Sequence, residues 1–449
     1  MTNTLSVTDG TTTIYLTSSG VVLTSYMPKA PDFDAATDSY KDVTEPVEFL
    51  IADTTTANVQ AKLAALDVLL QGARRAQAGR GARVYLHFQA GADSAAWRSE
   101  ILDYRLELGE DAAVGLYQAR LECTLIVVRR SYWEDTTLRT LALSNGNGSG
   151  ATSGLSIYNH DDSATGHDNW VQIASTDVTG VLPAGCQVRL TNDTGTTRTF
   201  TKIYLALNAY SDPANFSHIL EGESRASGGT VVSDATYYSN GQALSFTVGS
   251  GGTPSTSTFT WTLPAATLQD AAGRAFRLLA RFAGGLGTTT VFAEVRAANG
   301  SSVLWRGGSV ALPDLYGGLT DLGVVPLPPG GYSTAYGALT LALTFTGIAT
   351  RYLDFLQLTP MDAFVLLECM APCAHGESVM YDSIADRQYI LSGSAELGYV
   401  TASGGNLLLQ PGVINRLIVL QENSTGTNRG EIYEMFTVLV RYRPRRLTI

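Results

Sequence analysis

The chain has 449 residues, a formal net charge of −11 at pH 7 and only 16% charged side chains. This length exceeds one ordinary hydrophobic core, so we expect two or three domains. The negative charge argues against nucleic acid or an anionic membrane as a partner, and the four dispersed cysteines argue against a disulfide framework. The sequence lacks both an apolar run long enough for membrane insertion and a secretion signal at its start, so we expect synthesis in the cytoplasm.

Residues 55–77 are the only long stretch whose pattern predicts a helix. Threonines at the start offer capping hydroxyls, and Arg74 and Arg75 near the end complement the helix dipole. A single amphipathic helix needs an apolar surface to lie on, so we expect a β-sheet or a small barrel beneath it. The apolar residues recur every three or four positions and so share one face; they are Val59, Leu63, Leu66, Leu70 and Ala73.

Strand-like runs surround this helix within residues 1–135. Residues 12–17 and 21–26 are short β-rich runs joined by Ser18, Ser19 and Gly20, which predicts a hairpin between them. The other predicted strands of this block are residues 43–51, 84–89, 97–108 and 117–129.

Residues 144–154 are almost purely Gly, Ser, Asn and Thr, which predicts a flexible linker or a long turn. Evenly spaced strands follow it, as in a sandwich or jelly roll. The strands after residue 378 are too few for a domain of their own, so we expect them to complete the sheet begun at residue 155. The predicted strands are residues 155–159, 170–175, 187–191, 201–207, 243–248, 258–263, 276–282, 291–297, 339–344, 352–358, 388–391, 406–409, 416–420 and 436–442.

The order of features in the first block resembles one known family. After the short hairpin come an acidic-apolar strand at residues 45–49, one helix, the run Trp-Arg-Ser-Glu at 97–100 and an exit at 129–133. This order resembles the ring domain of the distal tail proteins, the baseplate hub proteins of long-tailed bacteriophages. Near the other end, residues 407–417 and 440–444 are similar to the closing strands of that family's galectin-like domain.

The resemblance implies a mainly β, multidomain chain. A β-barrel or sandwich with one α-helix would span residues 1–138 and form the ring by oligomerisation. A discontinuous galectin-like β-sandwich would follow at 139–217 and 374–449, carrying an inserted β jelly roll at 218–373. Insertions enter at loop tips and leave their ends close together, so this arrangement costs the host sandwich little.

The inserted block resembles the carbohydrate-binding jelly rolls of secreted glycoside hydrolases, through residues 220–223 and 352–358. In that family, acids of the first and last strands hold a structural calcium. The resemblance gives this role to Glu221, Glu223 and Asp354, whose hard oxygen ligands suit calcium.

Aromatic residues in or beside the loops of the insertion suggest a glycan site, because aromatic faces pack against sugar rings. Core packing is the alternative, above all for Trp261, which alternates with Phe259 and Leu263. The candidate glycan-binding residues are Trp305, Tyr316, Tyr332 and Tyr336.

Three other clusters have ordinary structural explanations that we favour. His160, Asp161, Asp162, His167 and Asp168 could bind a metal or activate water, but their turn-forming neighbours favour a hydrogen-bonded loop. Small buried thiols are favoured over a zinc site or a disulfide for the cluster of Cys369, Cys373 and His375. Pairing with carboxylates of a neighbouring subunit is favoured over nucleic acid for Arg441, Arg443, Arg445 and Arg446.

We therefore expect a structural tail protein rather than an enzyme, with no catalytic residue and no required cofactor beyond the implied calcium. The family resemblance implies a homohexameric ring at the tail tip of the virion, joined to tail tube and tail-tip hub proteins. The jelly roll would bind host-surface polysaccharide with avidity from several copies. The alternatives are a secreted-type polysaccharide-binding lectin or glycan-active enzyme, and a tail protein whose insertion is a spacer without ligand.

Overall fold

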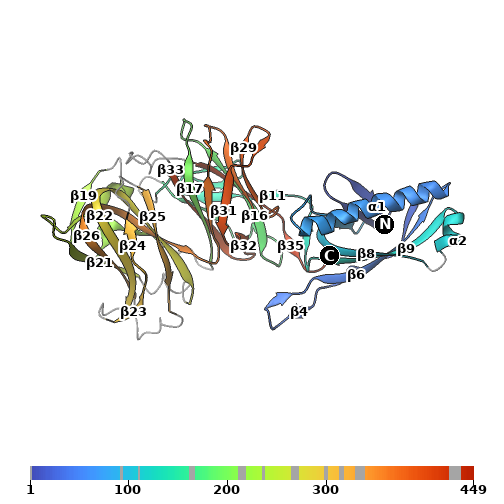
Figure 1. Ribbon diagram of the computed structural model, residues 1–449, viewed down its shortest axis with the longest axis horizontal. Coiled ribbons are helices and arrows are strands. Elements are labelled where there is room, and N and C mark those ends of the chain that lie inside the picture. Colours follow the sequence, from blue (N-terminus) through green and yellow to red (C-terminus); the bar gives the residue numbers. More distant parts are fainter. Residues whose placement is uncertain are drawn as a thin grey trace. The chain divides into compact units, whose positions relative to one another are not determined.

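The computed structural model is mainly β (Figure 1), as the sequence predicts. It describes residues 3–91, 95–109, 112–160, 167–210, 219–234, 238–263, 273–297, 302–312, 318–328, 339–423 and 436–449. The chain divides into two compact units. Unit 1 comprises Met1–Leu138, Thr179–Leu182 and Arg443–Ile449, and unit 2 comprises Arg139–Val178 and Pro183–Tyr442. Within the described residues, no helix is long and apolar enough to cross a membrane.

Unit 1 is one antiparallel sheet in the order β2-β1-β7-β8-β9-β6-β3, with the long helix α1 packed on it. Helix α1 spans Thr56–Gln77, and its cap Thr55 accepts a hydrogen bond from the backbone N–H of Asn58. Four of the five predicted apolar positions are buried, together with Leu69, and Leu63 is partly buried against the same core. The strands of the sheet are β1 (Thr4–Thr8), β2 (Thr13–Tyr15), β3 (Val21–Ser25), β6 (Val43–Ala52), β7 (Tyr85–Gln89), β8 (Trp97–Leu108) and β9 (Arg120–Arg129).

The predicted hairpin between residues 12–17 and 21–26 is wrong. Strand β2 pairs with β1, whereas β3 pairs with β6, so the two runs lie at opposite edges of the sheet and share only a bridge between Ser18 and Val21. The true hairpin joins β1 to β2 through Asp9 and Gly10. The Asp9 carboxylate accepts hydrogen bonds from two following backbone N–H groups, and Gly10 adopts a φ of 89°, which favours glycine. Residues 117–119 are also not strand, because the short helix α2 (Ala112–Tyr117) ends there.

A fully buried ion pair joins β6 to β9. The guanidinium of Arg129 donates from Nε to Oε1 of Glu45 at 2.8 Å and from Nη2 to Oε2 at 3.1 Å. Both side chains are 0% exposed, and the Arg129 guanidinium lies over the ring of Trp133, 4.4 Å from its centroid. Glu45 also accepts hydrogen bonds from the Tyr26 hydroxyl and the Lys29 backbone N–H. The pair is therefore completely hydrogen-bonded, the condition under which buried charges are tolerated.

The C-terminal segment returns to unit 1. Strand β35 (Arg445–Arg446) pairs with β10 (Trp133–Asp135), and Figure 1 marks both chain ends in this unit. Arg445 donates to Glu134 at 2.8 Å, and Glu134 also binds Arg98. The expectation that the terminal arginines pair with a neighbouring subunit is wrong for Arg445, whose carboxylate partner lies in its own chain.

Unit 2 contains two sheets built from strands on both sides of residues 219–360. Their orders are β11-β34-β16-β28-β29-β30, joined by β14 and β32, and β13-β12-β15-β33-β17-β27-β31. Strand β34 pairs with β14 and β16, and β33 pairs with β15 and β17, so the last strands complete the sheet begun at residue 155, as predicted. Residues 144–154 contain no free linker, because β12 and β13 form a hairpin there.

The strands of these two sheets are interspersed along the chain. They are β11 (Arg139–Thr140), β12 (Leu143–Asn145), β13 (Gly148–Ala151), β14 (Leu155–Ile157), β15 (Trp170–Ile173), β16 (Ala184–Asn192), β17 (Phe200–Tyr210), β27 (Phe364–Cys369), β28 (Ser378–Asp382), β29 (Arg387–Ser392), β30 (Ala395–Leu397), β31 (Val400–Gly404), β32 (Leu408–Leu409), β33 (Ile414–Asn423) and β34 (Phe436–Tyr442).

A third set of strands in unit 2 is organised around two long strands, β22 and β26, which pair with each other along almost their whole length. Each of these two strands covers two shorter strands that the sequence predicts separately. The pairing between β22 and β26 shifts register near Phe282. The elements are β18 (Ile219–Glu221), η2 (Gly222–Ser224), β19 (Thr230–Ser233), η3 (Ser239–Gly241), β20 (Gln242–Val248), β21 (Ser255–Leu263), β22 (Ala275–Ala297), β23 (Val303–Arg306), β24 (Val310–Leu312), β25 (Gly318–Pro326) and β26 (Leu339–Pro360).

A separate apolar cluster packs this third set of strands against the sheet that contains β17 and β33. Its buried members come from both parts of unit 2; they are Tyr204, Ala206, Leu279, Leu319, Phe355, Phe364, Ile418 and Leu420. Arg277 on β22 also lies over the ring of Phe364, 5.0 Å from its centroid. The two parts of unit 2 are thus joined by a buried apolar contact and not only by the connecting chain segments.

Arg129→Ala should destabilise unit 1 by about 3–5 kcal/mol, because it leaves the Glu45 carboxylate buried without its partner. Calorimetric unfolding of the full chain measures the effect on the transition of unit 1. Arg74→Ala is the matched control, since Arg74 pairs with Asp103 at a site where both side chains are 57% exposed. The control should leave the transition unchanged. Equal effects of the two substitutions would contradict the assigned role of the buried pair.

Unit 1 should lose stability as the pH falls from about 6.5 to 4. Burial, with smaller contributions from the nearby charges of Arg98 and Arg443, lowers the pKa of His87 to about 4. The unfolded chain therefore binds more protons in this window, and up to about 3 kcal/mol of stability is lost across it. Urea titrations at several pH values measure the loss. His87→Gln should remove it, whereas His375→Gln at an exposed position should not.

Candidate functional site

Unit 1 carries a projecting arm, residues 27–42, between β3 and β6. Its outer part is a small hairpin of β4 (Phe33–Asp34) and β5 (Ser39–Tyr40), which Figure 1 shows extending from the sheet of this unit. The rings of Phe33 and Tyr40 pack edge to face with centroids 5.2 Å apart. Met27 is nevertheless 81% exposed and Phe33 54% exposed. The arm therefore presents large apolar side chains to solvent.

The base of this arm is fixed by the buried ion pair. The Lys29 backbone N–H donates to Glu45 at 2.9 Å, and the Lys29 carbonyl accepts from Nη2 of Arg129 at 2.8 Å. The Tyr26 hydroxyl donates to the same carboxylate at 2.7 Å. Burial and the Glu45 charge raise the pKa of Tyr26 well above its usual range, so its proton stays in this hydrogen bond. The hairpin that carries the exposed Phe33 is thus held by a rigid root.

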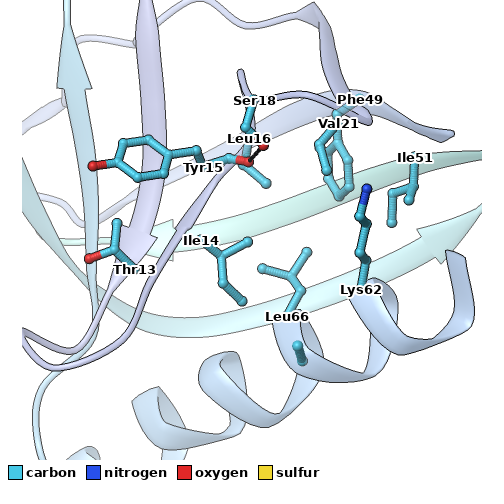
Figure 2. Close-up of a pocket in the computed structure, with 11 residues that line it drawn as sticks. Thr13, Ile14, Tyr15, Leu16, Ser18, Val21, Phe49, Ile51, Lys62 and Leu66 are labelled. Carbon is cyan, nitrogen blue, oxygen red and sulfur yellow. Dashed lines mark hydrogen bonds between the residues drawn. The ribbon is translucent and has the colours of Figure 1, made fainter. Parts of the chain in front are cut away.

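The same unit has an apolar cleft of about 260 Å³ beneath the edge strands. Figure 2 shows Leu66 and Lys62 extending from α1 toward the strands, with Ile14 of β2 facing them. The cleft exists because β2 and β3 are the two edges of the sheet and do not pair, which leaves the seam between them open. At its rim, Nζ of Lys62 lies 2.8 Å from the Asp53 carboxylate. Thr13, Tyr15 and Ser18 also line the cleft, but most of its surface is apolar, which suits an apolar side chain.

The structure describes one of the four predicted glycan-binding residues. Trp305 lies on β23, is half-buried and packs against the core of the jelly-roll-like strands, while its neighbours Val303 and Leu304 are exposed. Its ring lies close over Gly307. Tyr316, Tyr332 and Tyr336 lie outside the described residues.

The three predicted calcium ligands lie in one region, and each accepts a hydrogen bond from a protein group, although Oε2 of Glu223 is buried without a hydrogen-bond partner among the described residues. Asp354 is buried and accepts hydrogen bonds from the backbone N–H of Ser239 and from Arg281. Glu221 accepts from the Ser239 hydroxyl at 3.2 Å, and Glu223 from Nδ2 of Asn240 at 3.5 Å. Across the described part of the chain, no group of three His, Cys, Asp or Glu side chains is arranged to hold a metal ion.

Sequence reasoning missed a polar cleft of about 320 Å³ in the sandwich sheets of unit 2. Strands β28, β29 and β31 border it, and its exposed or half-buried polar lining includes Asp386, Arg387, Gln388, Ser403 and Asn406. Groups of this kind hydrogen-bond neutral hydroxyls. Residues 386–388 and 403–406 carry no recognisable pattern, so only the fold brings them together.

In the histidine cluster, His160 and His167 contact each other through their rings. Nδ1 of His167 lies 3.3 Å from Nε2 of His160, and the ring of His167 stacks on Tyr158 with centroids 3.9 Å apart. Asp168 accepts a hydrogen bond from the Gly146 backbone N–H. Asp161 and Asp162 lie outside the described residues.

The cysteines behave as small buried side chains. All four are free and buried, and burial raises the pKa of both Cys369 and Cys373 to about 12. These thiols therefore stay protonated at neutral pH, which makes them poor nucleophiles. Cys369 and Cys373 are thus small buried thiols, as predicted.

No protein-family model matches the chain, and no curated protein matches it. Among solved structures, it is similar to the phage P2 baseplate in its activated conformation with Ca, with 7% identity, complete coverage of both chains and a TM-score of 0.31. It is similar to Arthrobacter globiformis T6 isomalto-dextranase complexed with panose, with 13% identity over 45% of this chain and 40% of that one and a TM-score of 0.24. It is also similar to the enzymatically active domain of bacteriophage CBA120 tailspike protein 4, with 16% identity over 35% of this chain and 19% of that one and a TM-score of 0.19. These TM-scores fall short of a shared fold.

Proposed function

We propose that the chain is a structural protein of the phage tail, of the distal tail or baseplate hub kind, and that unit 1 forms a ring at the tail tip. The proposal is supported by the order of motifs in residues 1–135 that resembles the ring domain of that family. The observation that carries it is the combination of a rooted arm with exposed apolar residues and an open apolar cleft in the same unit. A closed ring needs two different complementary patches on each subunit, and these two features are of that kind.

The proposed ring domain comprises residues 1–138 together with the returning segment 443–449. A galectin-like sandwich follows, and residues 219–360 form its inserted jelly roll. Residues 364–369 fall inside the 218–373 range expected for the insertion, but β27 pairs with β17 and β31 of the sandwich, so we place the end of the insertion before Phe364. The ring would contain six copies, sit at the virion tail tip and contact tail tube and hub proteins, as the family resemblance implies.

In this proposal the chain is not an enzyme, and the insertion binds host-surface polysaccharide through the region of Trp305. Weak sites repeated around a ring gain affinity by avidity. The polar cleft of the sandwich is the alternative place for the glycan, because its amides, hydroxyl and charged groups can bind sugar hydroxyls. The rival functions are a secreted-type lectin or glycan-active enzyme and a tail protein with a spacer insertion. Rings without glycan binding would favour the spacer.

Phe33→Asp should weaken ring formation by roughly 30-fold or more, the effect of losing an interface contact of about 2 kcal/mol. The substitution replaces the exposed ring of Phe33 with a charge and leaves the root of the arm unchanged. Native mass spectrometry and electron micrographs of the full chain measure the copy number across a concentration series.

Tyr399→Asp is the control for this experiment, because Tyr399 is an equally exposed aromatic residue (54%) outside unit 1. It should leave the ring intact. A wild-type chain that stays monomeric at every concentration would count against the proposed ring. A Phe33→Asp chain that keeps the ring would exclude the arm as its contact.

Trp305→Ala should weaken binding of a host-surface polysaccharide by about tenfold, the effect of losing roughly 1.4 kcal/mol of aromatic stacking. Glycan arrays identify the ligand, and titration calorimetry then measures the dissociation constant. Asn406→Ala in the polar cleft is the matched variant and should leave binding unchanged. If only Asn406→Ala weakens glycan binding, the glycan site lies in the sandwich. If the wild-type chain binds no glycan, the insertion is a spacer without ligand.

A further inference from the structure

Asp354 occupies a special position on β26. The neighbouring strand β22 pairs Arg281 with Phe355 and Phe282 with Leu353, so Asp354 is the extra residue of a β-bulge. Bulges turn a side chain out of the regular alternation of a strand. Here the bulge leaves Asp354 fully buried, where one carboxylate oxygen accepts from the Ser239 N–H at 2.8 Å and the other from Nη1 of Arg281.

Arg281 is as deeply buried as its partner. It is 1% exposed and lies in an otherwise apolar segment, between Ala280 and Phe282. A buried guanidinium needs an anion, and the bulge supplies one. Arg281 and Asp354 therefore form a buried ion pair.

Two further acids approach this pair, Glu221 at the end of β18 and Glu223 in the turn η2 that follows. An added Cβ at Gly222 would lie 2.1 Å from the Leu353 carbonyl oxygen, so only glycine lets the turn come this close to β26. The close approach brings Glu221 and Glu223 toward Asp354. All three acids accept hydrogen bonds from one small group of residues, Ser239, Asn240 and Arg281.

We propose that the Arg281 guanidinium is the built-in cation of this acid cluster and takes the place of the calcium implied by the resemblance. Calcium takes six to eight oxygen ligands, including carboxylates free to coordinate it. Both oxygens of Asp354 already accept hydrogen bonds from protein donors, and a guanidinium beside them repels a second cation. The jelly roll is therefore stable without divalent metal. Replacing Arg281 with a neutral residue converts the cluster into one that binds calcium.

The test compares calorimetric unfolding of the full chain in CaCl₂ and in EDTA. We expect the wild-type chain to unfold at the same temperature in both. In EDTA, the unit 2 transition of Arg281→Met should fall by about 10 °C, because Asp354 loses its buried partner. Ca²⁺ should restore most of this fall and Mg²⁺ should not, because Mg²⁺ demands a tighter octahedral site. Asp354→Asn in the Arg281→Met background should abolish the recovery.

Arg277→Met is the matched control, because Arg277 lies on the same strand and its ion pair with Asp321 is partly exposed. It should show no response to calcium. The proposal is overturned if calcium raises the unfolding temperature of the wild type, or if it does not raise that of Arg281→Met. Should Arg281→Met not fold, titration of the wild type with CaCl₂ decides: no binding supports the proposal, and stoichiometric binding overturns it.

Discussion

The buried pair of Glu45 and Arg129 is the constraint on which the architecture of unit 1 depends. It joins two neighbouring strands of the sheet, β6 and β9, and it also binds the backbone of Lys29 and contacts Trp133. Removing two charges from water costs several kcal/mol, so the pair adds little net stability over an apolar contact of the same volume. Its effect is geometric, because a completely hydrogen-bonded charge pair has few alternative arrangements. The direction in which the arm leaves the sheet is fixed by that pair.

Unit 2 uses a second buried ion pair for a different purpose. Arg281 and Asp354 lie at the β-bulge where the two longest strands, β22 and β26, change register. The guanidinium reaches the carboxylate and neutralises it inside the protein. Both units therefore place an arginine rather than a lysine in the core, since the planar guanidinium satisfies several acceptors at once and stays charged.

Local signals in the sequence predicted the elements well, and partners distant in the sequence decided the rest. The long helix was predicted to within one residue because Thr55 and the two terminal arginines mark its ends, and β8 and β34 match their predicted bounds. The predicted hairpin between residues 12–17 and 21–26 is wrong because Asp9 and Gly10 form a stronger turn signal. That turn joins β2 to the preceding strand β1 instead. Arg445 and Glu134 are 311 residues apart, so the cluster of arginines at the end of the chain gives no indication that Glu134 is the partner of Arg445. The charge at Arg281 within an apolar run was a usable signal that its partner had to be buried nearby.

The contact between the two parts of unit 2 changes what an inserted jelly roll can do. A module attached only at a loop tip samples many orientations, and each copy loses that freedom when it binds. Here Phe355 of β26 and Phe364 of β27 lie in one buried cluster with Tyr204 and Ile418 of the sandwich, and Arg277 covers the ring of Phe364. Burying such side chains resists reorientation, because separation would expose apolar surface on both parts. A jelly roll held in this way has less orientational entropy to lose on binding, which is the condition under which repeated weak sites bind most effectively.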